Sequence, residues 1–441
     1  MDTPDTPQPG SWATASATSE RMELSNEWHA RPNINLPAPF RCTHLVALHE
    51  GSSAGDAHRK LGELCASHGQ STPAAGSRYH ILEAGSCLIK WESHTEATSH
   101  TILVAGNGQP AFGETAIDFL DTGWREILLG EMFVGVQVEI LSGEDPTDPH
   151  GFERAKALLG ANSVYGGWMG GRNATVWSAF RLDASGFVRL IIFDRGMEEE
   201  QLARLLQRLL DMETYRMLAM KALPHAREVM ASLQELEPQL DAVMRSLAEH
   251  NDGPARERAL SEITELAARV EQLSSAHAAR FGGARAYAGI VERRAEEVRE
   301  EILDNHQRYT NFLLRALVPA MRTCDAAERR THDLAQQVSR AANLLTTMVD
   351  MEQTRQSHGI LESMADRAKT QLRLQQAVEG FSIFAISYYA VGLLKYALEA
   401  AHDMGLPVDS DIVAGAAVPV VFALVFLSVR SVRLRLSRGD D

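Results

Sequence analysis

Three residues whose side chains bind metals or carry protons occupy every second position of the segment KWESHTE. Glu92, His94 and Glu96 would share one face of a β-strand, because successive side chains point to opposite faces of a strand. Two carboxylates and an imidazole on one face suit a divalent cation or proton transfer. The alternative is a sheet face on which these residues pair with basic neighbours, since the sequence shows no second ligand-bearing segment.

A second pair of polar side chains lies in the segment HARP. His29 and Arg31 stand beside Pro32 in an extended stretch, and an imidazole with a guanidinium can bind a carboxylate or a phosphate. Structural ion pairs use the same groups, so the alternative is a clamp that holds this segment onto the sheet.

Motifs of the common enzyme classes are absent from the sequence. The segment YGGWMGGR lacks the spacing and the GK[ST] ending of nucleotide-binding loops, and its place between strands predicts flexible sheet backbone. No nucleophile elbow, catalytic cysteine context or HExxH motif occurs. We therefore expect a protein that is not an enzyme and whose one candidate cofactor is a divalent cation.

Charge and cysteine usage limit the partners and the compartment. A formal net charge of -15 argues against nucleic-acid binding, which needs clustered Lys and Arg to replace condensed counterions. Cysteines 42, 65, 87 and 324 show neither zinc-binding nor disulfide spacing, which is typical of reduced thiols. Most of the chain is therefore expected on the cytoplasmic side.

The elements that would position these residues begin after a polar segment. Residues 1–22 are rich in Thr, Pro, Ser and Ala and predict a disordered tail without an export signal. Residues 23–196 predict an α+β domain with a mostly antiparallel sheet, because β-branched and aromatic residues alternate between Gly, Asp and Ser turns. The clearest hairpin is VWSAFRLDASGFVRLIIF.

Residues 197–379 predict a helical bundle and stalk, because apolar residues recur every three or four positions. Breaks are expected near Pro224, at HNDGPARER and around Gly282 and Gly283, with the last helix starting near Tyr309. After residue 344 the apolar stripe keeps only an approximate heptad phase, which suits a multi-helix stalk.

Two apolar runs follow, at residues 380–398 and 412–430. Lys395 is the only charge in the first run, and the second has none before Arg430. Each matches the hydrocarbon core of about 30 Å, so together they predict a transmembrane hairpin. Candidates for lining a pore or for close helix packing are Ser382, Ser387, Tyr388, Tyr389 and Gly392.

Charges around the hairpin predict its orientation. Arg367, Lys369 and Arg373 precede the first run, and residues 431–441 form a basic tail after the second. The connecting loop, residues 399–411, carries only acids and one His. Because cytoplasmic flanks are rich in Lys and Arg, both termini are expected in the cytoplasm and the loop outside, in a bacterial inner membrane.

This order of parts resembles the CorA-type magnesium transporters, which have a cytoplasmic α/β domain, a long stalk helix and two spans. The resemblance implies an oligomeric cation channel or transporter in the lipid bilayer, a homo-oligomer that would be a pentamer if CorA-like. The Gly-Met-Asn motif of that family is missing, because HDMGLPVDSD has Met404 before Gly405 and no Asn. Ion selectivity is therefore not implied.

Longer motifs resemble a bacterial family of uncharacterised membrane-anchored proteins. They occur in order along almost the full sequence: NEWHARP, KWESHTE, ETYRMLAMKALPHARE, PAMRTCDAAERR and LRLQQAVEGFSIFAISYYAVGL. This resemblance implies no activity. Two functions stay open, a CorA-like cation channel or transporter and a membrane-anchored structural or protein-interaction module without transport.

Overall fold

The computed structural model describes residues 21, 34–49, 54–74, 77–107, 110–143, 147–250, 252–403 and 409–436. His29 and Arg31 lie outside these residues, as do Met404, Gly405, residues 437–441 and the expected disordered tail apart from residue 21. The chain forms two compact units, which are described separately. Unit 1 comprises residues 1–244 and 262–340, and unit 2 comprises residues 245–261 and 341–441.

An eight-stranded sheet is the centre of unit 1, with the order β2-β3-β4-β1-β5-β8-β7-β6. Its strands are β1 (Phe40–Leu48), β2 (Tyr79–Ala84), β3 (Cys87–Ser93), β4 (Ala97–Ala105), β5 (Met132–Ser142), β6 (Tyr165–Met169), β7 (Ala174–Leu182) and β8 (Val188–Asp194). Neighbouring strands are antiparallel except β5 and β8, which run parallel. The expected α+β class and the expected hairpin, now β7 and β8, are confirmed.

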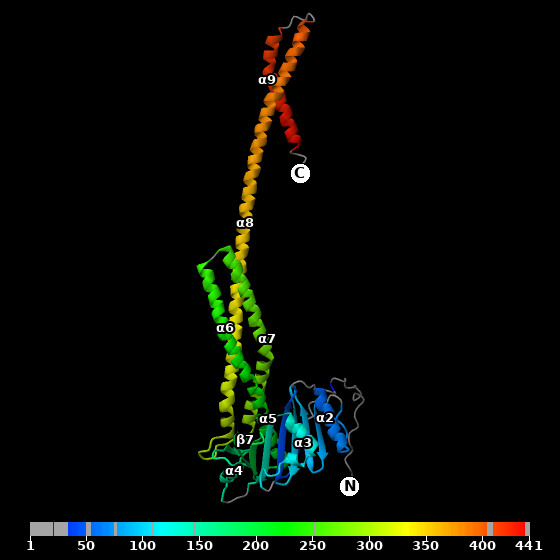
Figure 1. Ribbon diagram of the computed structural model, residues 1–441, viewed down its shortest axis with the longest axis vertical. Coiled ribbons are helices and arrows are strands. Elements are labelled where there is room, and N and C mark those ends of the chain that lie inside the picture. The colour runs from blue at the N-terminus through cyan, green and yellow to red at the C-terminus, as the bar shows by residue number, and fades with distance from the viewer. Residues whose placement is uncertain are drawn as a thin grey trace, which may run out of the picture. The chain divides into compact units, whose positions relative to one another are not determined.

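Helices cover both faces of the sheet (Figure 1). One face packs against α2 (Ala54–Ser67), the short helix η1 (Ala116–Phe119) and α3 (Thr122–Gly130), and α4 (Phe152–Leu159) packs near β7. The apolar side chains of this face, among them Leu45, Ile89 and Trp91, are almost fully buried. The opposite face receives α5 (Glu199–Met220) and carries polar residues.

His44 links the sheet to α5. Its Nδ1 lies 2.8 Å from Oγ1 of Thr101 on β4, and its Nε2 lies 2.9 Å from Oγ1 of Thr214 on α5. The imidazole is 3% exposed, so both ring nitrogens exchange hydrogen bonds with protein groups away from water. A neutral imidazole, with one donor and one acceptor nitrogen, fits between two hydroxyls.

Acidification is expected to destabilise unit 1 through His44. Burial, together with the charges of His94, Lys90 and His100, lowers the pKa of His44 to about 3. An unfolded imidazole binds a proton below about pH 6.5, whereas the folded one stays neutral until about pH 3, so acid favours the unfolded state in that interval. At about pH 5, protonation of His44 in the unfolded state lowers the unfolding free energy by roughly 2 kcal/mol.

Denaturant unfolding at about pH 7.5 and about pH 5 measures this effect. Tryptophan fluorescence reports on unit 1, because all six tryptophans precede residue 178. His44→Gln should lose less stability than the wild type between the two pH values. Equal losses in the two proteins would contradict the assignment to His44.

Long helices follow the sheet. They are α5, α6 (Ala222–Glu249), α7 (Gly253–Glu297) and α8 (Tyr309–Asp403). The expected breaks near Pro224 and at HNDGPARER are confirmed, and so is the start of the last helix at Tyr309. The expected break at Gly282 and Gly283 is wrong, because α7 runs through both glycines and ends at Glu297. Helical glycines cost only about 1 kcal/mol each, which the rest of a long helix offsets.

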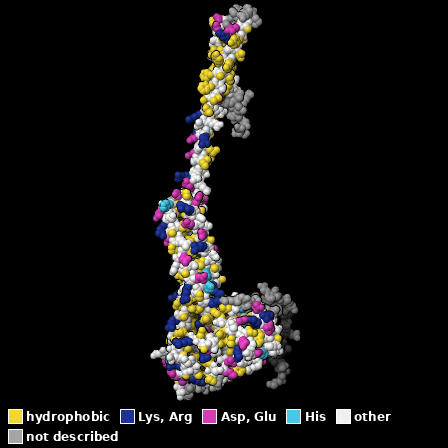
Figure 2. All heavy atoms as spheres, viewed as in Figure 1, with side chains coloured by type: hydrophobic (Ala, Val, Ile, Leu, Met, Phe, Trp, Pro, Cys, Tyr) yellow, Lys and Arg dark blue, Asp and Glu magenta, His cyan; other side chains and the backbone are white. Residues whose placement is uncertain are grey.

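Unit 2 contains the end of α8 and helix α9 (Ser410–Leu436). The two helices form an antiparallel hairpin in which the rings of Phe384 and Phe422 lie 5.4 Å apart and Lys395 pairs with Asp411 at 2.8 Å. Both have a stretch long and apolar enough to cross a membrane, of which only 11% and 6% is buried. Apolar side chains therefore cover much of the hairpin surface (Figure 2).

Candidate functional site

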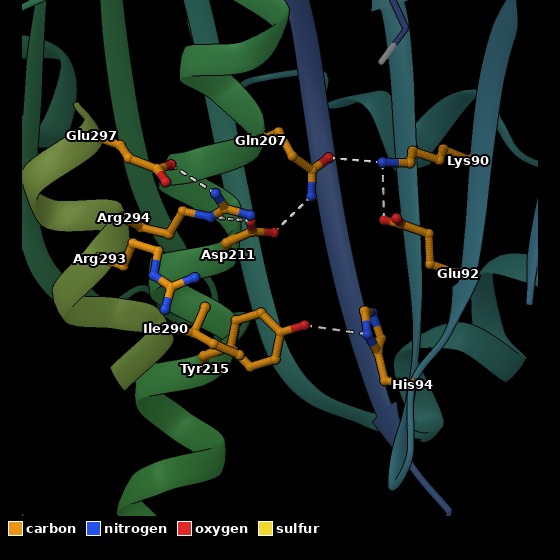
Figure 3. A pocket seen from close by; sticks show the side chains of 10 residues that line it. All are labelled: Lys90, Glu92, His94, Gln207, Asp211, Tyr215, Ile290, Arg293, Arg294 and Glu297. Carbon is orange, nitrogen blue, oxygen red and sulfur yellow. Dashed lines mark hydrogen bonds and ion pairs between the residues drawn. The ribbon is translucent and has the colours of Figure 1, made fainter. Parts of the chain in front are cut away.

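A charged pocket of about 390 Å³ lies within unit 1, between β3, α5 and α7 (Figure 3). Three segments that are far apart in the sequence contribute its walls. The lining residues are Lys90, Glu92, His94, Gln207, Asp211, Tyr215, Ile290, Arg293, Arg294 and Glu297. Cavities of this size accommodate small organic molecules.

Strand β3 supplies a buried ion pair. Side chains alternate along the strand, so Trp91 enters the apolar core while Lys90 and Glu92 face α5. Nζ of Lys90 lies 3.1 Å from a carboxylate oxygen of Glu92 and donates to Oε1 of Gln207 at 2.9 Å. Lys90 and Glu92 are only 4% and 6% exposed. Burying two charges is costly, and such arrangements gather at functional sites more than elsewhere.

Helix α5 supplies Gln207, Asp211 and Tyr215, which are spaced by four residues and therefore lie on one helix face. Nε2 of Gln207 donates to a carboxylate oxygen of Asp211 at 2.7 Å. The hydroxyl of Tyr215 lies 3.3 Å from Nδ1 of His94, which connects the helix to the end of β3.

Helix α7 closes the pocket with arginines. Nε of Arg294 donates to Asp211 at 2.8 Å, and its Nη1 donates to Glu297 at 2.7 Å. Arg208 lies 3.2 Å from the same Glu297 oxygen. Burial raises the pKa of Asp211 above its usual value, although the hydrogen bond from Gln207 and the charge of Arg294 act in the opposite direction.

Arg293 stands apart from this network. Within the described part of the chain no side chain forms an ion pair or a hydrogen bond with Arg293, and its guanidinium extends into the pocket near Tyr215 (Figure 3). Every carboxylate of the pocket already has a basic partner. The uncompensated charge that the pocket presents is therefore positive.

The three residues of KWESHTE do not share a strand face, and that expectation is wrong. Strand β3 ends at Ser93, so His94 and Glu96 lie in the turn before β4. Glu92 pairs with Lys90, whereas Glu96 pairs with Arg280 at 2.8 Å. Only Glu92 and His94 reach the pocket. The alternative interpretation, in which these acids pair with basic neighbours, describes both carboxylates.

A metal centre at these residues has no geometric support. Among the residues that the structure describes, no group of three or more His, Cys, Asp or Glu side chains is placed to hold a metal ion. The two carboxylates instead use their oxygens on the cations of Lys90 and Arg280.

The candidate residues of the first apolar run point in different directions. Ser387 is 7% exposed, and its buried hydroxyl has no hydrogen-bond partner among the described residues. It lies one turn after Phe384, on the side of α8 that packs on α9. Ser382 donates to the carbonyl of Val378 at 2.8 Å. Tyr388 and Tyr389 are largely exposed on the hairpin surface, and Gly392 is half-buried.

Sequence reasoning missed every pocket residue on α5 and α7. The available signal was the spacing of polar residues within otherwise apolar helices: Gln207, Asp211 and Tyr215 on α5, and Ile290, Arg294 and Glu297 on α7. That spacing identifies a polar face but not its partner.

Comparison with known sequence families gives one match. Residues 16–436 match the family described as "Protein of unknown function (DUF3422)". A comparison with curated proteins finds no match.

Proposed function

The chain belongs to the DUF3422 family, a family of unknown function, and we propose that it is a membrane-anchored protein whose unit 1 binds a small organic anion. The observation that carries this proposal is the pocket, in which a buried ion pair forms one wall and Arg293, which has no partner among the described residues, extends into the cavity. The proposal builds on the membrane-anchored module without transport that the sequence analysis left open. In this proposal unit 1 binds its ligand without a chemical reaction.

The pocket chemistry defines the ligand class. Since Glu92, Asp211 and Glu297 are paired, an anionic group entering the cavity meets Arg293 as the free charge. A guanidinium binds carboxylate or phosphate through two parallel hydrogen bonds. Gln207, Tyr215 and His94 add groups that hydrogen-bond to hydroxyl or amide substituents. The ligand is therefore a small carboxylate or phosphate ester with a polar body.

The anchor in this proposal is the hairpin of α8 and α9. Residues 380–398 and 412–430 would cross the bacterial inner membrane, with the 399–411 loop outside. Support comes from the basic residues on both flanks of the hairpin and from the acidic loop. The ion pair between Lys395 and Asp411 sits where the two helices approach the loop, at the depth where charges meet water.

Binding of defined anions tests the proposal. We expect succinate or inorganic phosphate to bind the purified full chain in isothermal titration, and Arg293→Ala to weaken that binding at least about tenfold. Comparing the two probes separates a carboxylate ligand from a phosphate ligand.

Arg329→Ala is the matched control. Arg329 is an exposed arginine of unit 1 on α8 that does not line the pocket. Its removal should leave binding unchanged. The proposal fails if neither anion binds, or if the Arg293 and Arg329 variants behave alike.

A CorA-like oligomeric cation channel or transporter is the second candidate. It is favoured by Tyr388 and Tyr389, whose side chains are 78% and 71% exposed near the middle of the first apolar run. Hydroxyls at that depth are costly against lipid, whereas they can line a passage. Cation flux into proteoliposomes above the flux into protein-free liposomes would support this function, and its absence would remove it.

A further inference from the structure

A second hollow, of about 420 Å³, lies within unit 1 beside the pocket of the proposed site. Its walls come from the first half of α5, the end of α7 and the turn between β6 and β7. The lining residues are Gly170, Gly171, Asn173, Met197, Gln201, Arg204, Leu205, Arg208, Glu297, Val298 and Arg299. The two cavities have similar volumes, and Glu297 lines both of them.

One face of α5 runs through both cavities. Gln201, Arg204 and Arg208 line the second hollow and follow one another by three or four residues, so they lie on the same side of the helix. The same spacing continues to Asp211 and Tyr215, which line the pocket. The cavities therefore follow one another along α5, with the second hollow nearer to the start of the helix.

An ion bridge separates the second hollow from the pocket. Nε of Arg208 and Nη1 of Arg294 donate to the same carboxylate oxygen of Glu297, at 3.2 Å and 2.7 Å. Figure 3 shows the Arg294 half of this bridge on the pocket side. Among the described residues, Glu297 is the one carboxylate that lines the second hollow, and it is already bound by two arginines.

The charge that the second hollow presents is positive. Three arginines line it, Arg204, Arg208 and Arg299, against the single carboxylate of Glu297. Arg204 pairs with Glu200 at 3.2 Å, but these side chains are 44% and 70% exposed, and exposed pairs are weak enough for an incoming anion to replace. Within the described part of the chain, the side chain of Arg299 forms no ion pair or hydrogen bond.

The backbone at Arg299 is unusual for a residue with a side chain. Its φ is 48°, in the left-handed region, and it follows the end of α7, where helices usually place a glycine. Two backbone hydrogen bonds to β6 and its turn hold the segment, from Gly170 to the carbonyl of Val298 at 3.3 Å and from Glu301 to that of Trp168 at 2.9 Å. Strained residues of this kind gather at ligand sites, and an arginine here places a guanidinium at the hollow.

We propose that the second hollow binds the diphosphate group of a small organic ligand. This site is additional to the one in the proposed function and does not depend on the membrane anchor. A guanidinium binds phosphate oxygens through parallel hydrogen bonds, and three arginines suit the several charges of a diphosphate better than the single charge of a carboxylate. Gln201 and Asn173 offer amide groups, and Met197 and Leu205 offer apolar surface, to the remainder of the ligand.

Inorganic pyrophosphate, without added divalent cations, is the probe for isothermal titration of the purified full chain carrying Arg293→Ala, which disables the pocket. We expect about one pyrophosphate to bind per chain, at least about tenfold more tightly than inorganic phosphate, because more arginine hydrogen bonds are made. Adding Arg299→Gly should weaken pyrophosphate binding at least about tenfold. It should leave the melting temperature unchanged or higher, because glycine adopts the left-handed region without strain.

Asp304→Gly is the matched control. Asp304 also has a left-handed backbone, with φ at 44°, but does not line the second hollow, so its replacement should not weaken pyrophosphate binding. An arginine that only stabilised the end of α7 would lower the melting temperature when removed, and that result at Arg299 would overturn the proposal.

The Arg293→Ala background distinguishes the two sites. Succinate binding that is lost in Arg293→Ala, with pyrophosphate binding retained, supports both sites. Pyrophosphate binding that Arg293→Ala abolishes belongs to the pocket and overturns the second hollow. Absence of pyrophosphate binding in every protein, or equal affinities with and without Arg299→Gly, also overturns it, whatever succinate does at the pocket.

Discussion

Replacing Glu213 by alanine is expected to lower the unfolding free energy of unit 1 by about 3–5 kcal/mol. Glu213 is fully buried on α5 and accepts a hydrogen bond from the hydroxyl of Tyr309 at 2.7 Å. It also accepts from Nε of Arg216 at 2.8 Å. Its removal leaves the Arg216 charge partly buried without a partner and the Tyr309 hydroxyl without an acceptor, and each loss is costly. Thermal unfolding followed by tryptophan fluorescence should show a melting temperature lower by roughly 10 °C.

Two further variants separate the lost ion pair from general disruption. Glu213→Leu combined with Arg216→Met removes both charges and should regain much of the stability lost in Glu213→Ala, because the buried arginine is no longer unpaired. Glu63→Gln breaks an exposed pair with Arg59 and should change the unfolding free energy by less than about 1 kcal/mol. A Glu213→Ala protein as stable as Glu63→Gln would disprove the role assigned to Glu213.

The fold class was predictable because local patterns determine it. Alternation of apolar and polar residues in VWSAFRLDASGFVRLIIF predicted β7 and β8, and apolar residues spaced by three or four positions predicted the long helices. The order of the strands was not predictable, since β1 lies between β4 and β5 and β8 pairs in parallel with β5. Those pairings depend on contacts between segments that are distant in the sequence, and local periodicity carries no information about such contacts.

The glycines of YGGWMGG lie in sheet backbone, as predicted, but the sequence did not show why glycine is needed there. They lie in and after β6 rather than in a nucleotide-binding loop. A Cβ on Gly166 would lie 1.9 Å from the carbonyl oxygen of Val176, and a Cβ on Gly167 would lie 2.6 Å from that of Glu301. The glycines therefore allow two backbone segments to approach β6 closely. No pattern in the sequence identifies those neighbours.

Two of the residues that line the pocket were identified from the sequence. Glu92 and His94 were selected for their chemistry, and both line the cavity. Their partners were not, because Gln207 and Arg294 are separated from β3 by more than a hundred residues. Lys90 was also overlooked, although alternation places it on the same strand face as Glu92. The apparent metal site is a set of ion pairs, because Lys90 on the same strand pairs with Glu92 and Arg280 on α7 pairs with Glu96.

Deleting residues 380–441 is expected to move the protein from the membrane fraction to the soluble fraction. Two apolar stretches of this length each favour insertion by several kcal/mol, summed from a few tenths of a kcal/mol per apolar residue. Without them, the described remainder of the chain has no other helix long and apolar enough to cross a membrane. Carbonate extraction followed by immunoblotting measures the distribution, and full-length protein should remain in the pellet.

Deletion of residues 1–22 is the matched control, because that segment is polar and contributes no apolar run. The shortened protein should stay in the membrane like the full chain. If carbonate releases the full-length protein, the hairpin does not span the bilayer, and its apolar surface must then be covered by other protein. If the chain lacking residues 380–441 stays in the carbonate pellet, another segment inserts, and the amphipathic stretch of α8 before residue 379 becomes the first to examine.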